Sequence, residues 1–358
     1  SKPDKGELYE PFAILPEVTS KIDEKVLIFA TSDTKEVQVK IRAGKNDVSG
    51  SVVLNHPSGW VVTPKSIPFS IAQKGEEIPV VFNVTPPNTE SEGKLEPKVT
   101  LNNKVFDKEL VEISYDHIPK QSVLLSSEAK VVRMDIKKSG EHIAYIMGAG
   151  DNVPESLEQI GYQVHIVDPN DIQNGDLDNY DAVVVGIRAY NVVDALKFKQ
   201  PVLFEYVKNG GTMIVQYNTA GRWASQFENI APYDVTLSRD RVTDENAEIE
   251  ILAPNNSLVN YPNTITQKDF DGWVQERGLY FPSEWSSEFT PILSMKDEGE
   301  TDKQGSLIVA PYGEGHYIYT GLSFFRELPV GVSGAYKLFA NMLSVGKDEV
   351  KRDSNVKG

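Results

Sequence analysis

The chain has 358 residues, of which 40% are hydrophobic and 25% are charged, and this composition is typical of a globular protein with two domains. Its 36 Lys and Arg residues against 52 Asp and Glu residues give a net charge of −16, which disfavours nucleic acid and anionic membrane surfaces as partners. No apolar run approaches the ~20 residues that span a bilayer, so no membrane insertion is expected, and the lack of cysteine excludes disulfides and thiol chemistry.

The first third of the chain alternates short apolar and polar positions. In residues 36–41, for example, Val37, Val39 and Ile41 fall on one face of an extended strand. Pro, Gly, Asn and Asp separate such segments, and none of them shows a helical period. Residues 1–118 are therefore predicted to form an antiparallel, immunoglobulin-like β-sandwich. Its strands are expected at residues 26–30, 36–41, 50–55, 67–71, 78–84, 98–101 and 110–115.

Part of this region resembles the sandwich module attached to bacterial α-galactosidases and other carbohydrate-active proteins. The pair Gly59-Trp60 and the closing residues 85–87, Thr-Pro-Pro, recur at the spacing usual for that module. The resemblance implies an accessory domain. Trp60 is a candidate sugar-stacking platform, although a core position is the preferred interpretation. His56 has no partner at metal-ligand spacing and is interpreted as a surface-loop residue.

Residues 119–142 are predicted to be a structured connector, and the pattern changes after them. From Ile143, strands that are continuous apolar runs alternate with helices, which is typical of a mostly parallel sheet covered on both faces. Residues 143–346 are therefore predicted to form an α/β domain of the flavodoxin-like type, followed by a polar tail at 347–358. Strands are expected at 143–147, 163–167, 181–187, 212–216, 307–310 and 316–320, helices at 154–160, 201–208 and around 336–343, and a long polar insertion at 221–301.

The stretch from Val207 to Asn218 joins a helix end, a double-glycine turn, a buried strand and a polar turn. It resembles the central strand of class I glutamine amidotransferase-like domains, in which this turn carries a cysteine. Tyr217 and Asn218 stand at that place, and neither is a credible nucleophile. The resemblance therefore implies an amidotransferase-type scaffold without its attacking group.

Three other chemistries find little support in the sequence. The Gly148-Ala149-Gly150 turn with Asp168 suggests a dinucleotide fingerprint, but Val153 stands where the third glycine is needed and the next helix has barely two turns. No Gly-x-Ser-x-Gly elbow is present, and no His-x-x-His, His-Glu-x-x-His or His-Pro-Asp-Asp run supplies zinc ligands. We therefore predict no catalytic residue, no metal and no cofactor.

Polar and aromatic residues do gather where the predicted strands end, which is where open α/β sheets bind ligands. Amide, guanidinium and aromatic groups suit a saccharide, whose hydroxyls need donors and acceptors and whose rings stack on aromatic faces. The alternative, which the sequence slightly favours, is that Arg188 pairs with an acidic residue and pins the insertion. The candidate ligand-binding residues are Arg188, Tyr190, Asn191, Tyr217, Asn218 and Arg222, with Trp273, Glu276 and Arg277 from the insertion.

Three segments, at residues 143–151, 185–191 and 313–321, resemble the carboxy-terminal region of large PIG-L (LmbE-like) deacetylases of Bacteroidetes-type bacteria. In that family a zinc deacetylase acting on N-acetylglucosamine-type groups precedes a sandwich and an amidotransferase-like domain. The His-Pro-Asp-Asp motif of the deacetylase is absent here, so none of its catalytic residues is carried over. The resemblance implies an accessory region, with the amino-terminal deacetylase domain of the same polypeptide as partner and a periplasmic or extracellular setting.

The leading hypothesis is therefore a non-catalytic region of a larger carbohydrate-active protein, which binds saccharide at the carboxyl ends of the α/β strands. Ser1 begins the chain without a methionine or a secretory leader, which agrees with a processed form or a piece of a longer protein. The alternative is a hydrolase or transferase in which Glu276 and His316 form an acid–base pair. That mechanism requires the two side chains to approach within ~3 Å, directly or through one water.

Overall fold

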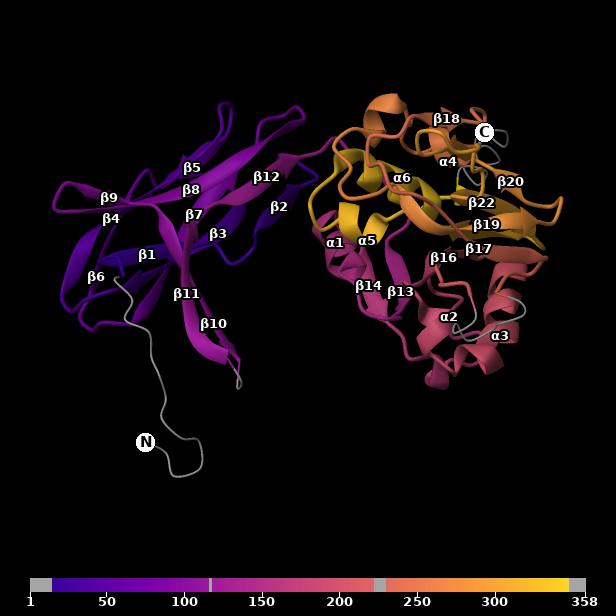
Figure 1. Ribbon diagram of the computed structural model, residues 1–358, viewed down its shortest axis with the longest axis horizontal. Coiled ribbons are helices and arrows are strands. Elements are labelled where there is room, and N and C mark those ends of the chain that lie inside the picture. The colour runs from indigo at the N-terminus through magenta and orange to yellow at the C-terminus, as the bar shows by residue number, and fades with distance from the viewer. Residues whose placement is uncertain (1–14, 116–117, 222–229, 348–358) are drawn as a thin grey trace, which may run out of the picture. The chain divides into compact units, whose positions relative to one another are not determined.

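The computed structural model describes residues 15–115, 118–221 and 230–347 (Figure 1). The chain forms two compact units that divide between Asp135 and Ile136. Residues 119–135, predicted as part of a connector, belong to the first unit. They contribute β11 (Ile118–Ser126), which pairs with β10 (Lys108–Tyr115), and β12 (Ala129–Arg133), which is a strand of the sandwich. No separate connector element is formed by these residues.

The first unit is a β-sandwich whose two sheets share one hydrophobic core. One sheet has the order β1-β3-β7-β5, with β1 (Val18–Lys21), β3 (Lys35–Ala43), β7 (Glu77–Thr85) and β5 (Val61–Thr63). The other has the order β2-β12-β8-β4-β6, with β2 (Val26–Phe29), β8 (Ser91–Leu101), β4 (Val48–Asn55) and β6 (Ile67–Ile71), and β9 (Lys104–Phe106) pairs with β8. Val37, Val39 and Ile41 of β3 all point into the core, as their alternation predicts.

A two-stranded ribbon, β10–β11, forms a sheet of its own and extends away from the two sandwich sheets (Figure 1). Two ion pairs attach β10 to the rest of the unit. Glu109 is buried and pairs with Lys25, and Glu112 accepts a hydrogen bond from Arg42 at 2.8 Å. β11 is therefore the outer strand of a ribbon that is held through its inner strand.

The second unit contains a seven-stranded sheet of order β14-β13-β15-β16-β23-β22-β20. The first five strands are mutually parallel, and the last two run antiparallel to their neighbours. The strands are β13 (His142–Ile146), β14 (Gln163–Ile166), β15 (Ala182–Val185), β16 (Thr212–Gln216), β20 (Thr290–Pro291), β22 (Leu307–Tyr312) and β23 (Gly315–Thr320). Numbered along the chain, the parallel strands have the order 2-1-3-4-5, so the direction of winding reverses between β13 and β15.

The centre of this sheet is buried on both faces, because every residue of β15 and β16, and Ile143 to Ile146 of β13, is buried. The helices are α1 (Val153–Gln159), α2 (Ala189–Val192), α3 (Leu196–Lys208), α4 (Ser257–Asn260), α5 (Phe324–Glu327) and α6 (Ser333–Leu343), with 3-10 turns at Pro169–Asp171 and Gln267–Phe270. In α6, Tyr336, Phe339, Ala340 and Leu343 are buried together, which confirms the predicted apolar stripe.

The region predicted as a polar insertion has its own strands and its own buried side chains. β17 (Val235–Val242) pairs with β19 (Gly278–Trp285), and β18 (Ile249–Ile251) pairs with β21 (Leu293–Met295). Phe270, Trp273 and Phe281 are at most 3% exposed. The insertion is thus a folded part of the second unit.

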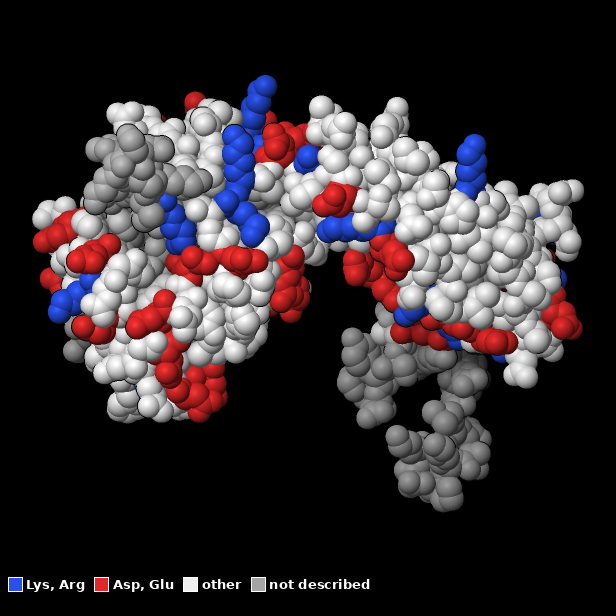
Figure 2. Space-filling view, turned by 180° about the vertical axis from the view of Figure 1, so that it is seen from behind, with Lys and Arg blue, Asp and Glu red and all other residues white. Residues whose placement is uncertain are grey.

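Acidic side chains prevail on the surface. On the face of the second unit seen in Figure 2, Asp and Glu are interspersed with fewer Lys and Arg, in keeping with the net charge of −16. Ion pairs between exposed side chains, such as Lys94–Glu128 at 2.7 Å, stabilise a fold by about 0–1 kcal/mol each. In the part of the chain that the structure describes, no helix is long and apolar enough to cross a membrane.

Candidate functional site

The candidate site lies at the carboxyl edge of the parallel sheet, where the segments after β13, β15 and β16 meet. The backbone N–H of Arg188, after β15, donates to the carbonyl of Tyr217, after β16, at 2.8 Å. The N–H of Ala149, after β13, donates to the carbonyl of Ile187 at 2.9 Å. The winding of the sheet reverses between β13 and β15, and this is the place where open α/β sheets bind ligands.

The glycine turn after β13 owes its sequence to packing. A Cβ atom at Gly148 would lie 2.1 Å from the carbonyl oxygen of Ile187, so only glycine allows the two turns to approach this closely. Asp168 caps the following 3-10 turn by accepting the N–H of Asn170 at 2.9 Å. The two features that suggest a dinucleotide fingerprint therefore both have a structural role.

Two asparagines of the predicted site join the turns to each other. Asn218 is 1% exposed, and its side chain accepts from the N–H of Tyr190 and donates to the carbonyl of Gln216, each at 3.0 Å. Asn191 donates to the carbonyl of Thr219 at 3.2 Å and accepts from its N–H at 2.8 Å. The ring of Tyr190 is part of the hydrophobic core. Asn218, Asn191 and Tyr190 therefore hold the turns in position at the edge of the sheet.

Asn218→Ala is expected to lower the free energy of unfolding by about 2 kcal/mol, because the N–H of Tyr190 would stay buried without an acceptor. Asn218→Asp keeps that acceptor but sets a buried carboxylate against the carbonyl oxygen of Gln216, so at neutral pH its loss should be at least as large. Thermal melting of the full chain measures both. Equal melting temperatures for Asn218→Ala and the native chain would contradict the structural role given to this amide.

A cluster of aromatic side chains begins at Tyr217, in the turn after β16. The ring of Tyr217 is stacked on that of Tyr280, with centroids 6.0 Å apart and planes 10° apart, and it contacts the ring of Phe325 at 5.3 Å. The guanidinium of Arg326 lies 4.8 Å from the centre of the Phe325 ring. Tyr217 is 7% exposed, whereas Tyr280 and Phe325 are half-buried. Tyr280 and Phe325 therefore expose aromatic surface to solvent, whereas the ring of Tyr217 that they contact is buried.

Burial raises the pKa of Tyr217 above its ordinary value, and the nearby charge of Arg188 only partly opposes this effect. The hydroxyl is thus protonated at neutral pH and acts as a hydrogen-bonding group. Arg188 itself has a φ of +56°, whereas no such strain occurs at Tyr217 or Asn218, where an amidotransferase-type nucleophile would stand. The turn after β16 therefore lacks both the chemistry and the strained geometry of a nucleophile elbow.

Three residues other than glycine with positive φ belong to this edge. They are Arg188 at +56°, Gln275 at +69° and Tyr280 at +54°. Each such conformation costs of order 1–3 kcal/mol and persists only where the surroundings enforce it, which happens most often at functional sites. The Nε of Arg188 is buried and has no hydrogen-bond partner among the residues with described positions. The guanidinium donor of Arg188 and the ring of Tyr280 are therefore both positioned by a strained backbone.

Glu276 and His316 do not form an acid–base pair. Glu276 accepts a hydrogen bond from the Nε of Arg326 at 2.8 Å, and its carbonyl accepts from Ser323 at 2.7 Å, just beyond the carboxyl end of β23. His316 lies at the other end of β23, opposite Thr212 at the start of β16. The two residues are at opposite edges of the sheet, so the required approach of ~3 Å is not made.

The remaining predicted residues are less accessible than a ligand site requires. Trp273 is 3% exposed and donates to the carbonyl of Asp269 at 3.1 Å. Arg277 is 5% exposed, donates to the carbonyls of Ala247 and Phe270, and lies 5.7 Å from the Trp273 ring. Both side chains hold the insertion together. Arg222 lies outside the described residues.

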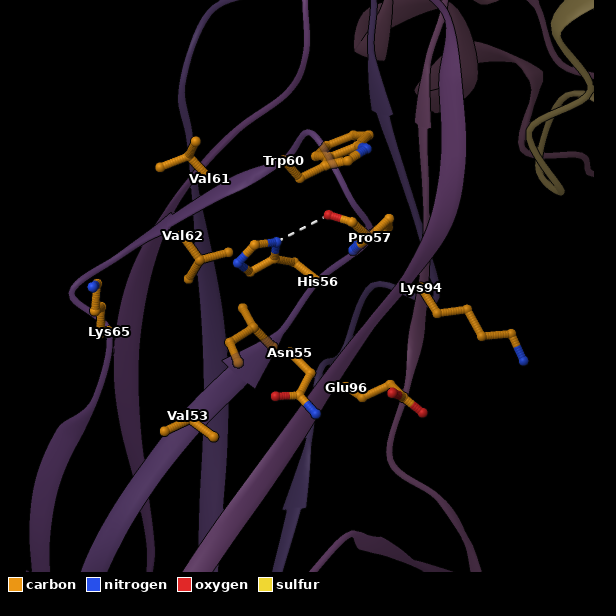
Figure 3. Close-up of a pocket in the computed structure, with 11 residues that line it drawn as sticks. Val53, Asn55, His56, Pro57, Trp60, Val61, Val62, Lys65, Lys94 and Glu96 are labelled. Atoms are coloured by element: carbon orange, nitrogen blue, oxygen red, sulfur yellow. Dashed lines mark hydrogen bonds between the residues drawn. The ribbon is translucent and has the colours of Figure 1, made fainter.

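The sandwich carries a separate groove of about 760 Å³ (Figure 3). His56 lies in its middle, where its Nδ1 is 3.0 Å from the carbonyl of Pro57, and Val61 contributes exposed apolar surface. Trp60 borders the groove but is only 3% exposed and packs edge-on against Phe29. The core interpretation of Trp60 and the surface-loop interpretation of His56 are confirmed.

Comparisons with known proteins assign no family. No family model and no curated protein matches the sequence. A β-galactosidase from Rahnella sp. R3 has a TM-score of 0.34 and 15% identity over 58% of this chain and 32% of its own. The CARDB domain of a Pyrococcus furiosus protein has a TM-score of 0.20 and 22% identity over 32% of this chain and 93% of its own. A family 123 glycoside hydrolase from Clostridium perfringens has a TM-score of 0.19 and 10% identity, over 56% and 38% of the two chains. The present chain thus spans about a third of the β-galactosidase, and likeness at this level carries no functional assignment.

Proposed function

We propose that this chain is a non-catalytic, saccharide-binding region of a larger carbohydrate-active protein, and that its second unit, a flavodoxin-like scaffold, binds the saccharide at its carboxyl edge. The observation that carries the proposal is a group of side chains, here named the edge cluster, that combines ring faces with fixed polar groups. The edge cluster consists of Arg188, Tyr217, Glu276, Tyr280, Phe325 and Arg326.

The chemistry of the edge cluster suits a sugar. The half-buried rings of Tyr280 and Phe325 offer apolar faces against which a pyranose ring can stack. Arg188 supplies a buried donor, and the carboxylate of Glu276 supplies an acceptor that the hydrogen bond from Arg326 holds in position. Fixed donors, acceptors and rings around one edge are the usual composition of a site for a small polar ligand.

The same residues argue against turnover. Tyr217 keeps its proton because burial raises its pKa, and Glu276 is engaged by Arg326 rather than by a histidine. Asp151, the nearest carboxylate after β13, is also engaged, since it accepts the hydroxyl of Tyr145 at 2.7 Å and caps the start of α1 through the N–H of Val153. We therefore propose binding without bond cleavage.

The wider setting is proposed from the sequence resemblance. An accessory region of a PIG-L-like deacetylase would work outside the cytoplasm, beside the amino-terminal deacetylase domain of the same polypeptide and on N-acetylated amino sugars. The excess of acidic residues over basic ones fits a neutral or amino-sugar ligand better than a phosphate backbone.

Calorimetric titration with N-acetylglucosamine oligomers and a panel of neutral saccharides tests this function. Phe325→Leu removes a stacking ring and keeps apolar bulk, so we expect the Kd to rise about threefold to tenfold. His56→Ala, in the sandwich groove, is the matched control and should leave the Kd unchanged. Binding that is weakened by His56→Ala and not by Phe325→Leu would place the site in the sandwich. No measurable binding to any saccharide of the panel would refute saccharide binding.

A further inference from the structure

The outer strand of the β10–β11 ribbon is exposed from Gln121 to its end at Ser126. Every residue from Gln121 to Ser126 is exposed, including three consecutive apolar residues, Val123 at 39%, Leu124 at 40% and Leu125 at 48%. Successive side chains of a strand point to opposite faces, so apolar surface is present on both faces of the ribbon. Such a run on a surface strand is uncommon unless another molecule covers it.

The outer edge of β11 also has an open backbone. Within the ranges 15–115, 118–221 and 230–347, β11 pairs with β10 and with no other strand. Half of the N–H and C=O groups of such a strand point outward and are ready to pair with another strand. A ribbon of two strands is by itself only marginally stable, so added strands would stabilise it.

Residues 121–127 lack the features that usually protect an edge strand, and the two such residues of β11, Pro119 and Lys120, lie at its amino-terminal end. Residues 121–127, Gln-Ser-Val-Leu-Leu-Ser-Ser, contain no charge, no proline and no glycine, although a quarter of the whole chain is charged. Edge strands that must stay unpaired carry lysine, proline or a bulge at such positions. Their absence from residues 121–127 favours pairing of this part of the strand.

The sequence of β11 indicates which strand would pair with it. The segment is nearly palindromic about Leu124. An antiparallel copy centred there places Val123 opposite Leu125, and Ser122 opposite Ser126. Apolar residues then face apolar residues, hydroxyls face hydroxyls, and no like charges oppose each other. A contact in which the same surface serves both partners is what a two-fold dimer requires.

We propose that β11 is a self-association edge through which two copies of this chain pair as antiparallel strands about a two-fold axis at Leu124. The two ribbons then form one four-stranded sheet in the order β10-β11-β11-β10. The ion pairs of β10 with Lys25 and Arg42 hold this sheet to both sandwiches. The dimer buries the apolar residues of β11 against the apolar residues of the other copy. It also pairs the outward N–H and C=O groups of β11.

The absence of native cysteine allows a register-specific test. In the proposed pairing, residue 124 faces its own copy at a Cα separation of ~4.5–5.5 Å, which a disulfide can bridge. Leu124→Cys should therefore give a covalent dimer under mild oxidation. Ser122→Cys alone should not, because residue 122 faces residue 126 of the other copy. A mixture of Ser122→Cys and Ser126→Cys chains should give the mixed dimer.

Sedimentation of the native chain provides an independent measurement. We expect a monomer–dimer equilibrium that Leu124→Lys shifts at least tenfold toward monomer, while Ser58→Lys, on an exposed loop of the sandwich, leaves it unchanged. A native chain that stays monomeric at ~100 µM, or Leu124→Cys chains that cross-link no faster than Ser122→Cys chains, would overturn the proposal, whatever else covers the strand.

Discussion

Trp60→Ala is expected to lower the free energy of unfolding of the sandwich by about 3–5 kcal/mol, which makes it one of the most damaging single changes in the chain. The indole is 3% exposed, packs edge-on against Phe29 at 5.0 Å and donates to Ser91 at 3.0 Å. Its removal leaves a cavity between the sheets and an unpaired hydroxyl. Trp60→Phe keeps a ring beside Phe29 and should cost much less.

Hydrogen-exchange mass spectrometry of the full chain distinguishes the two units in this experiment. Peptides of the sandwich should lose protection in Trp60→Ala, whereas peptides beyond Ile136 should keep it, because the two units have separate cores. The affinity for saccharide should not change if the edge cluster is the site. A native melting temperature combined with lost saccharide binding would instead make Trp60 a stacking platform.

The second large effect is a dependence of stability on pH through Glu327. This carboxylate is fully buried, and burial raises its pKa from 4.5 to about 7, although the N–H of Val274 at 2.9 Å and the hydroxyl of Ser323 partly oppose the shift. The folded chain therefore keeps a proton that the unfolded chain loses above pH ~4.5. The resulting stabilisation is complete below that pH and is lost as the pH rises through about 7.

Glu327→Gln should remove this dependence. At pH 5 the variant and the native chain should be similarly stable, and at pH 8 the variant should be more stable by up to about 3 kcal/mol. Urea unfolding of the second unit at several pH values measures the difference, with Glu284→Gln on an exposed part of β19 as control. A native-minus-variant difference that stays constant from pH 5 to pH 8 would show that Glu327 does not titrate in this range.

The sequence predicted the elements whose patterns are local. β6 at 67–71 and β16 at 212–216 occur where alternation and a continuous apolar run placed them. β1 and β5, with four and three residues, are too short to show a period. The main strands of the insertion were missed because β17 includes the charged run Arg239-Asp240-Arg241 and β19 is interrupted by Pro282, so neither shows a clear alternation.

The site was predictable to the extent that it lies at strand ends. Arg188 and Tyr217 follow β15 and β16 and meet at the sheet edge, as the topology of open sheets dictates. Tyr280 joins them from the insertion, and Phe325 and Arg326 join them from beyond β23, where the aromatic-basic run Phe324-Phe325-Arg326 is a local signal that the sequence analysis missed. Nothing in the sequence around Arg277 indicates that its guanidinium is enclosed by carbonyl groups.

The position of β12 has a consequence for how the chain is divided and made. This strand lies between β2, with which it is parallel, and β8, with which it is antiparallel. A truncation at residue 118 would delete an interior strand and detach β2 from its sheet. On the ribosome, likewise, the sheet that contains β2 is incomplete until Arg133 has emerged, so β2 must wait for β12, the last strand of the sandwich sheets, before it finds its neighbour.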